Sequence, residues 1–322
     1  MKYSHIEGID KPISRLVQGT MMVNSKEQKY SFDLLDAVYA GGCNTFDTAH
    51  VYSNGDNERT VGRWVNERGL REKVVIIGKG AHHNQDRRRV TPFDITADLH
   101  DSLARFKFDY IDLYLLHRDD PLVPVGPIVE ILNEHYRAGK IHAFGGSNWS
   151  HTRIAEANEY AISHGLRPFS ASSPNFSLAE QFKEPWEGCV SISGNSMVAA
   201  RAWYAVHNLP LFTWSSLAGG FFSGRFSRNM TDVGADYFDK LVAECYFHPQ
   251  NFDRLDRANV IAAEKGLTVA QVALAYVLSQ PLNIFALTGG RTAEEFLANA
   301  AALESPFSAA ESAWLNLERD TR

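Results

Sequence analysis

Cysteine is scarce in this sequence of 322 residues, which contains only Cys43, Cys189 and Cys245. The three lie far apart and offer neither a disulfide framework nor the spacing of a metal site, which suits a reducing compartment. The N-terminal residues form no apolar signal segment, and no apolar run is long enough to cross a bilayer. These absences predict a cytoplasmic protein.

An excess of positive charge is also missing. The formal net charge is -6, with acidic and basic residues in both halves of the chain, so there is no electrostatic footprint for nucleic acid. The one basic cluster, Arg87-Arg88-Arg89, is short and is followed by Thr91-Pro92, which is typical of a solvated loop. We therefore expect a small-molecule partner, without nucleic acid or membrane; the sequence does not indicate an oligomeric state.

A glycine-rich turn, which a doubly wound dinucleotide-binding sheet needs after its first strand, is the third absence. The first predicted strand ends in Gly19-Thr20 and continues with Met21. The sequence does contain 44% hydrophobic residues, enough for a large core, arranged as alternating strand and helix patterns without an obvious linker. This pattern favours an α/β protein, a (β/α)8 TIM barrel that forms a single domain over residues 1–322, over the doubly wound sheet.

Eight apolar runs are predicted strands, and helical patterns follow them. The strands cover residues 16–20, 45–47, 74–79, 110–116, 141–146, 169–173, 211–214 and 284–287. The helices include residues 94–106, 125–137, 150–164, 196–207, 252–265, 268–279, 292–303 and 308–319. Two earlier helices are expected, one capped by Ser25 and ending at Gly41-Gly42 and one starting near Asn57, and residues 215–251 form a long connection.

Titratable side chains follow three consecutive predicted strands, and in a barrel the C-terminal strand ends carry the chemistry. They are Asp47 with Tyr52 five residues later, Lys79 and His117. Taken singly, each has a structural explanation, as a cap, a half-buried aromatic, a surface lysine or a core histidine. Because four different titratable types meet at one barrel mouth, we interpret them as a catalytic set.

This set suits the delivery of a proton to a carbonyl oxygen while a hydride reaches the carbonyl carbon. A phenol with a pKa of ~10 is a poor acid at neutral pH unless its anion is stabilised. A buried ammonium group at Lys79 would stabilise the anion of Tyr52, and Asp47 would keep that ammonium charged. His117 would hydrogen-bond the carbonyl oxygen and orient it.

With these residues the sequence resembles the aldo-keto reductases. The family's Asp-Tyr-Lys-His set falls on Asp47, Tyr52, Lys79 and His117, and residues 47–52 with Asn57, Glu58 and Gly62 are similar to the family's first signature. The resemblance runs through essentially the whole chain. It implies the barrel fold and the reduction of aldehydes or ketones to alcohols, with Tyr52 as the general acid.

The resemblance also implies an NADPH/NADP+ site. Residues 145–148 are similar to the family's Gly-x-Ser-Asn at the nicotinamide carboxamide, and residues 215–220 resemble the pyrophosphate loop. Residues 289–299 resemble a helix-opening motif in which Arg291 clasps the adenosine 2′-phosphate, which favours NADPH over NADH. The implied cofactor residues are Gly19, Thr20, Met21, Ser147, Asn148, Ser173, Trp214, Ser215, Ser216, Leu217, Ala218, Gly220, Gly289, Gly290, Arg291, Glu295 and Asn299.

Three positions depart from the family pattern without touching the catalytic set. Ser173 stands where the family commonly has Gln, which puts one carboxamide contact in doubt. Trp214 replaces the usual Tyr that stacks on the nicotinamide, and Thr288 replaces a common Pro.

The predicted substrate rim is polar. It contains His82, Arg118, Trp149 and Arg225. Such a rim favours a small polar carbonyl, such as a keto-sugar or an aldose, over a steroid or an arene. The loop 221–252, which carries Arg225, is a candidate lid over cofactor and substrate.

Two other functions stay open. One is a cofactor-sensing regulatory or interaction subunit with vestigial activity, which the intact catalytic set disfavours. The other is a metal-dependent barrel hydrolase using His50, His82, His83 and His117. We expect no metal, because two of these histidines are adjacent and Lys79 lies among the four.

Overall fold

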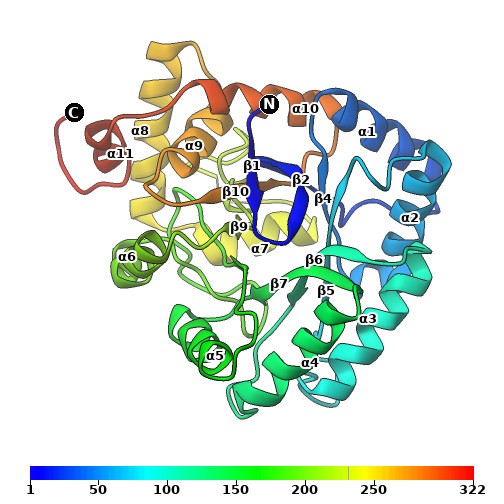
Figure 1. The fold of residues 1–322 in the computed structure, drawn as a ribbon. Coiled ribbons are helices and arrows are strands. Elements are labelled where there is room, and N and C mark those ends of the chain that lie inside the picture. Colours follow the sequence, from blue (N-terminus) through cyan, green and yellow to red (C-terminus); the bar gives the residue numbers. More distant parts are fainter. Residues whose placement is uncertain (231) are drawn as a thin grey trace. The chain divides into compact units, whose positions relative to one another are not determined.

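The computed structural model describes residues 1–230 and 232–322. Its parallel strands form a closed barrel in the order β10-β3-β4-β5-β6-β7-β8-β9 (Figure 1), so the predicted (β/α)8 fold is confirmed. The barrel strands are β3 (Leu16–Gly19), β4 (Thr45–Asp47), β5 (Val75–Gly80), β6 (Ile111–Leu116), β7 (Ile141–Ser147), β8 (Ala171–Ser173), β9 (Leu211–Thr213) and β10 (Ile284–Thr288).

Helices follow the strands along the chain. The α-helices are α1 (Gln28–Ala40), α2 (Asp56–Arg68), α3 (Pro92–Phe106), α4 (Val125–Arg137), α5 (His151–Ser163), α6 (Val198–His207), α7 (Tyr237–Tyr246), α8 (Pro249–Lys265), α9 (Val269–Leu278), α10 (Ala293–Asn299) and α11 (Ala309–Leu315). The 3-10 helices are η1 (Tyr52–Gly55), η2 (Asn195–Met197), η3 (Ala218–Gly220) and η4 (Ala300–Glu304).

The chain divides into two compact units. One contains residues 1–173 and 289–293, and the other contains residues 174–288 and 294–322. The first unit therefore contains β3 to β8 with α1 to α5, and the second contains β9 and β10 with α6 to α9 and α11. That residues 1–322 form a single domain stays a prediction.

The strands of the first unit are aligned so that their carboxyl ends lie at one edge. Asp47 pairs with Ile77, and Lys79 pairs with Leu115, in parallel registers. Every residue of β5 and of β6 is buried, as expected for parallel strands covered on both faces. Side chains that follow β4, β5 and β6 are therefore held close together by a rigid core.

The residues before β3 form a hairpin of β1 (Tyr3–Ile6) and β2 (Ile9–Ser14). One feature between β3 and α1 differs from the sequence prediction. Ser25 does not cap α1, because the helix begins at Gln28 after Glu27 and no side chain caps it. The backbone N–H of Ser25 instead donates to a carboxylate oxygen of Asp56 at 2.7 Å.

In the second unit, the connection predicted over residues 215–251 contains the unpredicted helix α7. The carboxylate of Asp236 caps it by accepting from the N–H groups of Phe238 and Asp239 at 2.9 and 3.1 Å. The proposed lid, residues 221–252, includes Thr231, which lies outside the described residues. Among the described residues no single helix could span a membrane; only α8 with α9, bent by 101°, passes the length and composition criteria.

Candidate active site

The segment that leaves β4 carries both Asp47 and Tyr52. The N–H groups of Thr48 and His50 donate to carbonyl oxygens of β5 at 2.8 Å each, so the chain stays beside β5 beyond the end of β4. Tyr52 then begins η1, and α2 starts immediately after it. The strand-to-helix turn predicted from the sequence is therefore built against the strand that carries Lys79.

Three consecutive residues after Tyr52 have left-handed backbones. The φ angles of Ser53, Asn54 and Gly55 are 48°, 52° and 83°. For non-glycine residues this conformation costs ~1 kcal/mol or more each, so surrounding contacts must impose it. A Cβ on Gly55 would lie 2.6 Å from Cζ of Arg105, so the guanidinium of Arg105 packs directly against this turn.

Lys79 and Asp47 form a buried ion pair. The Nζ of Lys79 lies 2.6 Å from Oδ1 of Asp47 and donates to its Oδ2 at 2.7 Å. Nζ also donates to the carbonyl oxygen of Thr48 at 2.9 Å. Both side chains are about 5% exposed or less, so the pair is shielded from solvent.

The ammonium form of Lys79 is favoured in this pair. Burial opposes it, but the carboxylate of Asp47 and the phenol of Tyr52 raise the pKa of Lys79 above its usual value. Burial also raises the pKa of the Asp47 carboxyl, against the pull of the ammonium. We assign the proton to Lys79, because Nζ donates to the Thr48 carbonyl as well as to the carboxylate, which favours a charged donor.

Tyr52 lies beside this pair. The Nζ of Lys79 is 5.2 Å from the centroid of the Tyr52 ring. Burial raises the pKa of Tyr52, and the charge of Lys79 lowers it by a smaller amount. Lys79 therefore lowers the pKa of Tyr52, as the sequence analysis expected, but burial raises this pKa by more. The phenol keeps its proton at neutral pH.

His117 meets Tyr52 edge to face, with ring centroids 5.9 Å apart and planes at 80°. Burial, together with the charges of Lys79 and Arg118, holds the pKa of His117 well below its usual value, so its imidazole is neutral. Among the described residues the buried Nδ1 has no hydrogen-bond partner. If Nδ1 carried the hydrogen, it would be a buried donor without an acceptor, which is unfavourable. We therefore place the hydrogen on Nε2, which makes Nε2 of the neutral ring a hydrogen-bond donor.

Ser147 ends β7 and Asn148 follows it, and hydrogen bonds connect both residues to this set. The Nδ2 of Asn148 donates to the carbonyl oxygen of His117 and to Oγ of Ser147, both at 3.2 Å. Oγ of Ser147 donates to the carbonyl oxygen of Ser173 at 3.1 Å. The Oγ of Ser173 is buried and has no hydrogen-bond partner among the described residues, which marks a polar position that a ligand can satisfy.

Other predicted cofactor residues of the first unit lie in two segments. Thr20 donates to the carbonyl oxygen of Asp47 through both its N–H and its Oγ1, at 3.0 and 2.7 Å, while Met21 is 40% exposed. Around the exposed Arg291, the hydroxyl of Tyr30 on α1 donates to the arginine carbonyl oxygen. Gly19 ends β3, and Gly289 and Gly290 precede Arg291.

The remaining predicted cofactor residues belong to the second unit. The hydroxyl of Ser216 donates to Thr213, and the N–H groups of Ala218 and Gly220 donate to carbonyl oxygens of their own loop. Those donors already have partners inside the loop, so pyrophosphate binding there would require the loop to rearrange. The half-buried Trp214, Ser215 and Leu217 share this loop, and Glu295 and Asn299 lie on α10.

The predicted substrate residues differ in their surroundings. The ring of His82 is 4.8 Å from that of His117, whereas Trp149 is fully buried and donates to the carbonyl oxygen of Arg118 at 3.1 Å. Arg118 is 6% exposed. In the second unit the guanidinium of Arg225 pairs with Asp239 at 2.9 Å, which neutralises part of the charge expected at the rim.

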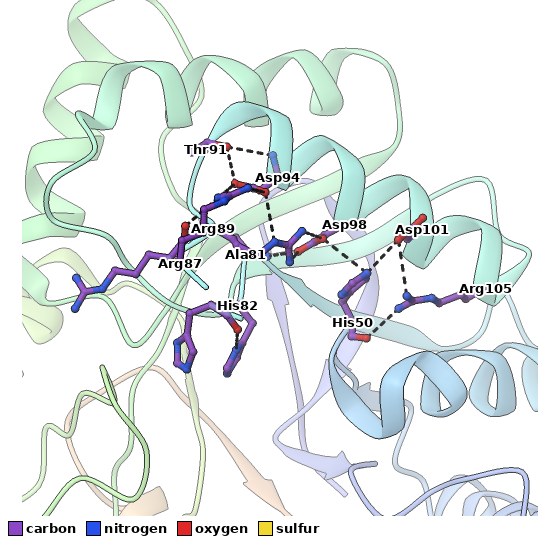
Figure 2. A network of polar contacts seen from close by, with 12 residues as sticks. His50, Ala81, His82, Arg87, Arg89, Thr91, Asp94, Asp98, Asp101 and Arg105 are labelled. Atoms are coloured by element: carbon purple, nitrogen blue, oxygen red, sulfur yellow. Dashed lines mark hydrogen bonds and ion pairs between the residues drawn. The ribbon is translucent and has the colours of Figure 1, made fainter. Parts of the chain in front are cut away.

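Several residues that support the loop carrying Asp47 and Tyr52 had no role in the sequence prediction. Arg105 on α3 donates to the carbonyl oxygen of His50 and to Glu58, both at 2.9 Å. The Nε2 of His50 lies 3.4 Å from Asp101 and 3.7 Å from Asp98 (Figure 2). Of these residues, the sequence analysis had named Glu58, as part of the motif that resembles the family's first signature.

No group of three or more histidine, cysteine, aspartate or glutamate side chains is placed to hold a metal ion in residues 1–230 and 232–322. The alternative of a metal-dependent hydrolase therefore has no ligand set in that part of the chain.

Comparison with known proteins identifies relatives over nearly the full length. The sequence model of the aldo/keto reductase family matches residues 15–316. The chain is 28% identical to "Aldo-keto reductase YhdN" of Bacillus subtilis (strain 168), covering 90% of this chain and 85% of the relative. It is also 28% identical to "Probable voltage-gated potassium channel subunit beta" of Oryza sativa subsp. japonica, covering 94% and 92%.

A solved structure shares the fold. It is the glycerol dehydrogenase AKR11B4 from Gluconobacter oxydans, with a TM-score of 0.77, 22% identity, and coverage of 98% of this chain and 94% of that chain. The assignment of the chain to a family rests on the match over residues 15–316. The chain belongs to the aldo/keto reductase family.

Proposed function

We propose that this protein is an NADPH-dependent reductase that converts a small polar aldehyde or ketone to the alcohol. Its family makes it an oxidoreductase that uses a nicotinamide cofactor and interconverts small-molecule carbonyls and alcohols. The observation that carries the finer proposal is the buried Lys79–Asp47 pair, with Nζ 5.2 Å from the ring of Tyr52. That arrangement supports Tyr52 as the proton donor.

The residues after β7 and β8 suit the carboxamide of a nicotinamide ring. A carboxamide has both a donor and an acceptor, and Ser147, Asn148 and Ser173 offer both kinds of group. The buried, unpaired Oγ of Ser173 is the observation that favours a ligand there, even though the family commonly has Gln at this position. When bound, NADPH would supply the hydride that is added to the carbonyl carbon.

The protein's own residues would handle the proton. As the carbonyl oxygen gains electrons, Tyr52 gives it the phenolic proton, and the ammonium of Lys79 stabilises the phenolate that remains. Asp47 keeps that ammonium charged and in place at 2.6 Å. His117, neutral and with its hydrogen on Nε2, donates a hydrogen bond that orients the carbonyl oxygen, and solvent later reprotonates Tyr52.

NADPH rather than NADH is proposed because of Arg291, whose guanidinium would bind the 2′-phosphate. Tyr30 supports this position by donating to the arginine carbonyl oxygen. The substrate class, a keto-sugar, an aldose or a similar polar carbonyl, is proposed from His82 and Arg118 near His117. The ring of His82 lies 4.8 Å from that of His117, and the charge of Arg118 helps to lower the pKa of His117.

The experiment is NADPH consumption by the purified protein against a panel of carbonyls, with Tyr52→Phe measured beside it. We expect the variant to bind NADPH normally, as followed by fluorescence, and to lose most turnover, because general acid catalysis contributes about 10²-fold or more. Normal turnover by Tyr52→Phe would refute the assignment of Tyr52. Absence of NADPH binding in the wild type would refute the cofactor assignment.

A second candidate function is a cofactor-sensing subunit of a larger assembly. It is favoured by one observation, the 28% identity over 94% of this chain to a protein named as a probable potassium channel β subunit. NADPH binding with negligible turnover on the whole panel would favour this candidate over the reductase.

A further inference from the structure

His82 lies outside the proposed catalytic set but contacts one of its members, His117. It follows β5 by two residues, and its ring meets the ring of His117 edge to face, with centroids 4.8 Å apart and planes at 78°. His117 in turn contacts the ring of Tyr52. A second imidazole therefore lies next to the group that we propose orients the carbonyl oxygen.

The hydrogen-bond partner of His82 fixes its tautomer. Its Nδ1 lies 2.7 Å from the carbonyl oxygen of His83. Because a carbonyl oxygen only accepts, Nδ1 must carry the hydrogen, and Nε2 of the neutral ring is then an acceptor. Burial and the charge of Arg118 lower the pKa of His82 to about 4, although the His83 carbonyl opposes this, so the neutral form is kept at physiological pH.

The acceptor Nε2 makes no hydrogen bond to any residue in the described ranges 1–230 and 232–322. His82 is only half-buried, so a ligand can reach it. The Nε2 lone pair can accept a hydrogen bond from a hydroxyl group of a ligand. It cannot bond a carbonyl oxygen, which is also only an acceptor.

The loop that carries His82 is locked to α3 on both sides of the histidine (Figure 2). The N–H of Ala81, in a left-handed conformation with φ 59°, donates to the buried Asp98 at 2.8 Å. Arg89 binds the same carboxylate at 2.6 and 3.1 Å. Arg87 binds both oxygens of Asp94 at 2.7 Å each. The loop is held before substrate arrives, so the imidazole of His82 is preorganised rather than mobile.

We propose that His82 determines specificity: its Nε2 accepts a hydrogen bond from a hydroxyl group on the carbon next to the substrate carbonyl. The substrate class is then an α-hydroxy aldehyde or α-hydroxy ketone. This inference rests on the reductase function proposed above, and it adds a requirement for the neighbouring hydroxyl. A substrate that lacks the hydroxyl leaves the acceptor unpaired, and sites built for a hydrogen bond reject such analogues.

The test compares lactaldehyde with propanal, which differ only in the hydroxyl group on the carbon next to the carbonyl. The quantity is the ratio of the two kcat/KM values in the holoenzyme with NADPH, compared between variants so that aldehyde hydration cancels. In His82→Phe, which keeps a ring of similar size without the acceptor, we expect the ratio to fall about tenfold or more. His82→Gln, which retains an acceptor oxygen, should recover part of the ratio.

His83→Phe is the matched control, since it makes the same chemical change at the neighbouring position. It should leave the ratio close to that of the wild type. An unchanged ratio in His82→Phe, or an equal fall in His83→Phe, would overturn the role of the acceptor. Equal loss of activity toward both aldehydes in His82→Phe would also overturn it, because that pattern reports support of His117. Failure of the wild type to reduce either aldehyde would instead overturn the proposed function.

Discussion

The guanidinium of Arg105 lies 2.9 Å from the buried carboxylate of Glu58, and it joins two helices to the turn that holds Tyr52. The same guanidinium donates to the carbonyl oxygen of His50 at 2.9 Å and packs against Gly55. The Glu58 side chain is 0% exposed and that of Arg105 is 16% exposed. The loop that carries Tyr52 is therefore held in place by an ion pair whose members lie outside the proposed catalytic set.

Breaking the Arg105–Glu58 pair should lower the stability of the protein and displace the loop that carries Tyr52. Arg105→Met leaves the Glu58 carboxylate buried without its partner, and such a change costs about 3 kcal/mol or more. We expect a lower Tm and a kcat about tenfold lower, with a smaller change in KM, because misplacing Tyr52 acts on the chemical step. The measurements are thermal unfolding and steady-state kinetics. Lys29→Met, in the exposed pair with Asp33 on α1, is the control and should change neither.

A second ion-pair cluster should matter for stability alone. The carboxylate of Asp112, 0% exposed on β6, lies 2.5 Å from Lys11 and 2.9 Å from Arg71, and it accepts from the N–H of Ile76 at 2.9 Å. Asp112→Ala leaves two partly buried cations unpaired, so we expect a loss of about 3 kcal/mol in the free energy of unfolding. Denaturant titration measures it. Because Asp112 lies near the start of β6 and the proposed catalytic residues lie at or beyond the carboxyl ends of their strands, kcat/KM should change little. A large kinetic effect would contradict this separation.

Local signals in the sequence predicted much of the fold. The predicted bounds of β4 and α4, residues 45–47 and 125–137, match the structure at both ends. In α4 apolar side chains recur at helical spacing, whereas β4 was predicted from a short apolar-containing run that ends at Asp47. The barrel followed from their repetition, and the proposed catalytic set was inferred from the strand ends of that barrel.

Long-range contacts explain most of what the sequence did not reveal. The partner of Glu58 is Arg105, 47 residues away, and no spacing rule connects the two. Ser25 looked like a helix cap, but its backbone is bound by Asp56 on another helix. The helix α7 was hidden because glycine and serine at the start of its connection suggested a loop. The net effect on the pKa of Tyr52 depended on burial, which the sequence alone does not quantify.

The raised pKa of Tyr52 predicts different pH profiles for the two directions of the reaction. Burial raises the pKa above the usual value of ~10, so the proton-donating form persists through neutral and moderately alkaline pH. The kcat/KM for carbonyl reduction should stay flat from about pH 6 to pH 10, whereas alcohol oxidation, which needs the phenolate, should rise over that range. Initial rates in both directions test this. A fall in reduction centred near pH 7 would contradict the assignment of Tyr52 as the acid.

Removal of the charge at Arg291 should weaken the preference for NADPH over NADH and leave kcat nearly unchanged. The charge-assisted bonds proposed between Arg291 and the 2′-phosphate are worth about 1.5–3 kcal/mol, equivalent to about tenfold or more in affinity. Arg291→Gln should therefore raise the KM for NADPH by at least that factor and leave the KM for NADH and kcat nearly unchanged. Arg319→Gln, at an exposed position near the C-terminus, is the control. An equal effect on NADPH and NADH would refute the phosphate contact.

The lowered pKa of His82 should make the free energy of unfolding depend on pH in the acidic range. Its folded value of about 4 lies below the ordinary value of 6.5, so between these two values the unfolded chain binds more protons than the folded protein. Stability should therefore fall as the pH is lowered from 6.5 toward 4, and the part due to His82 should level off below the folded pKa. His117, whose pKa is also lowered by burial, adds to the same trend. Because His82 is only half-buried, solvent screening reduces the size of its contribution.

Urea titrations of the wild type and of His82→Phe at pH 7, 6 and 5 measure how the free energy of unfolding changes with pH. The variant should lose less stability across this range than the wild type, and an identical slope would show that His82 is protonated equally in both states.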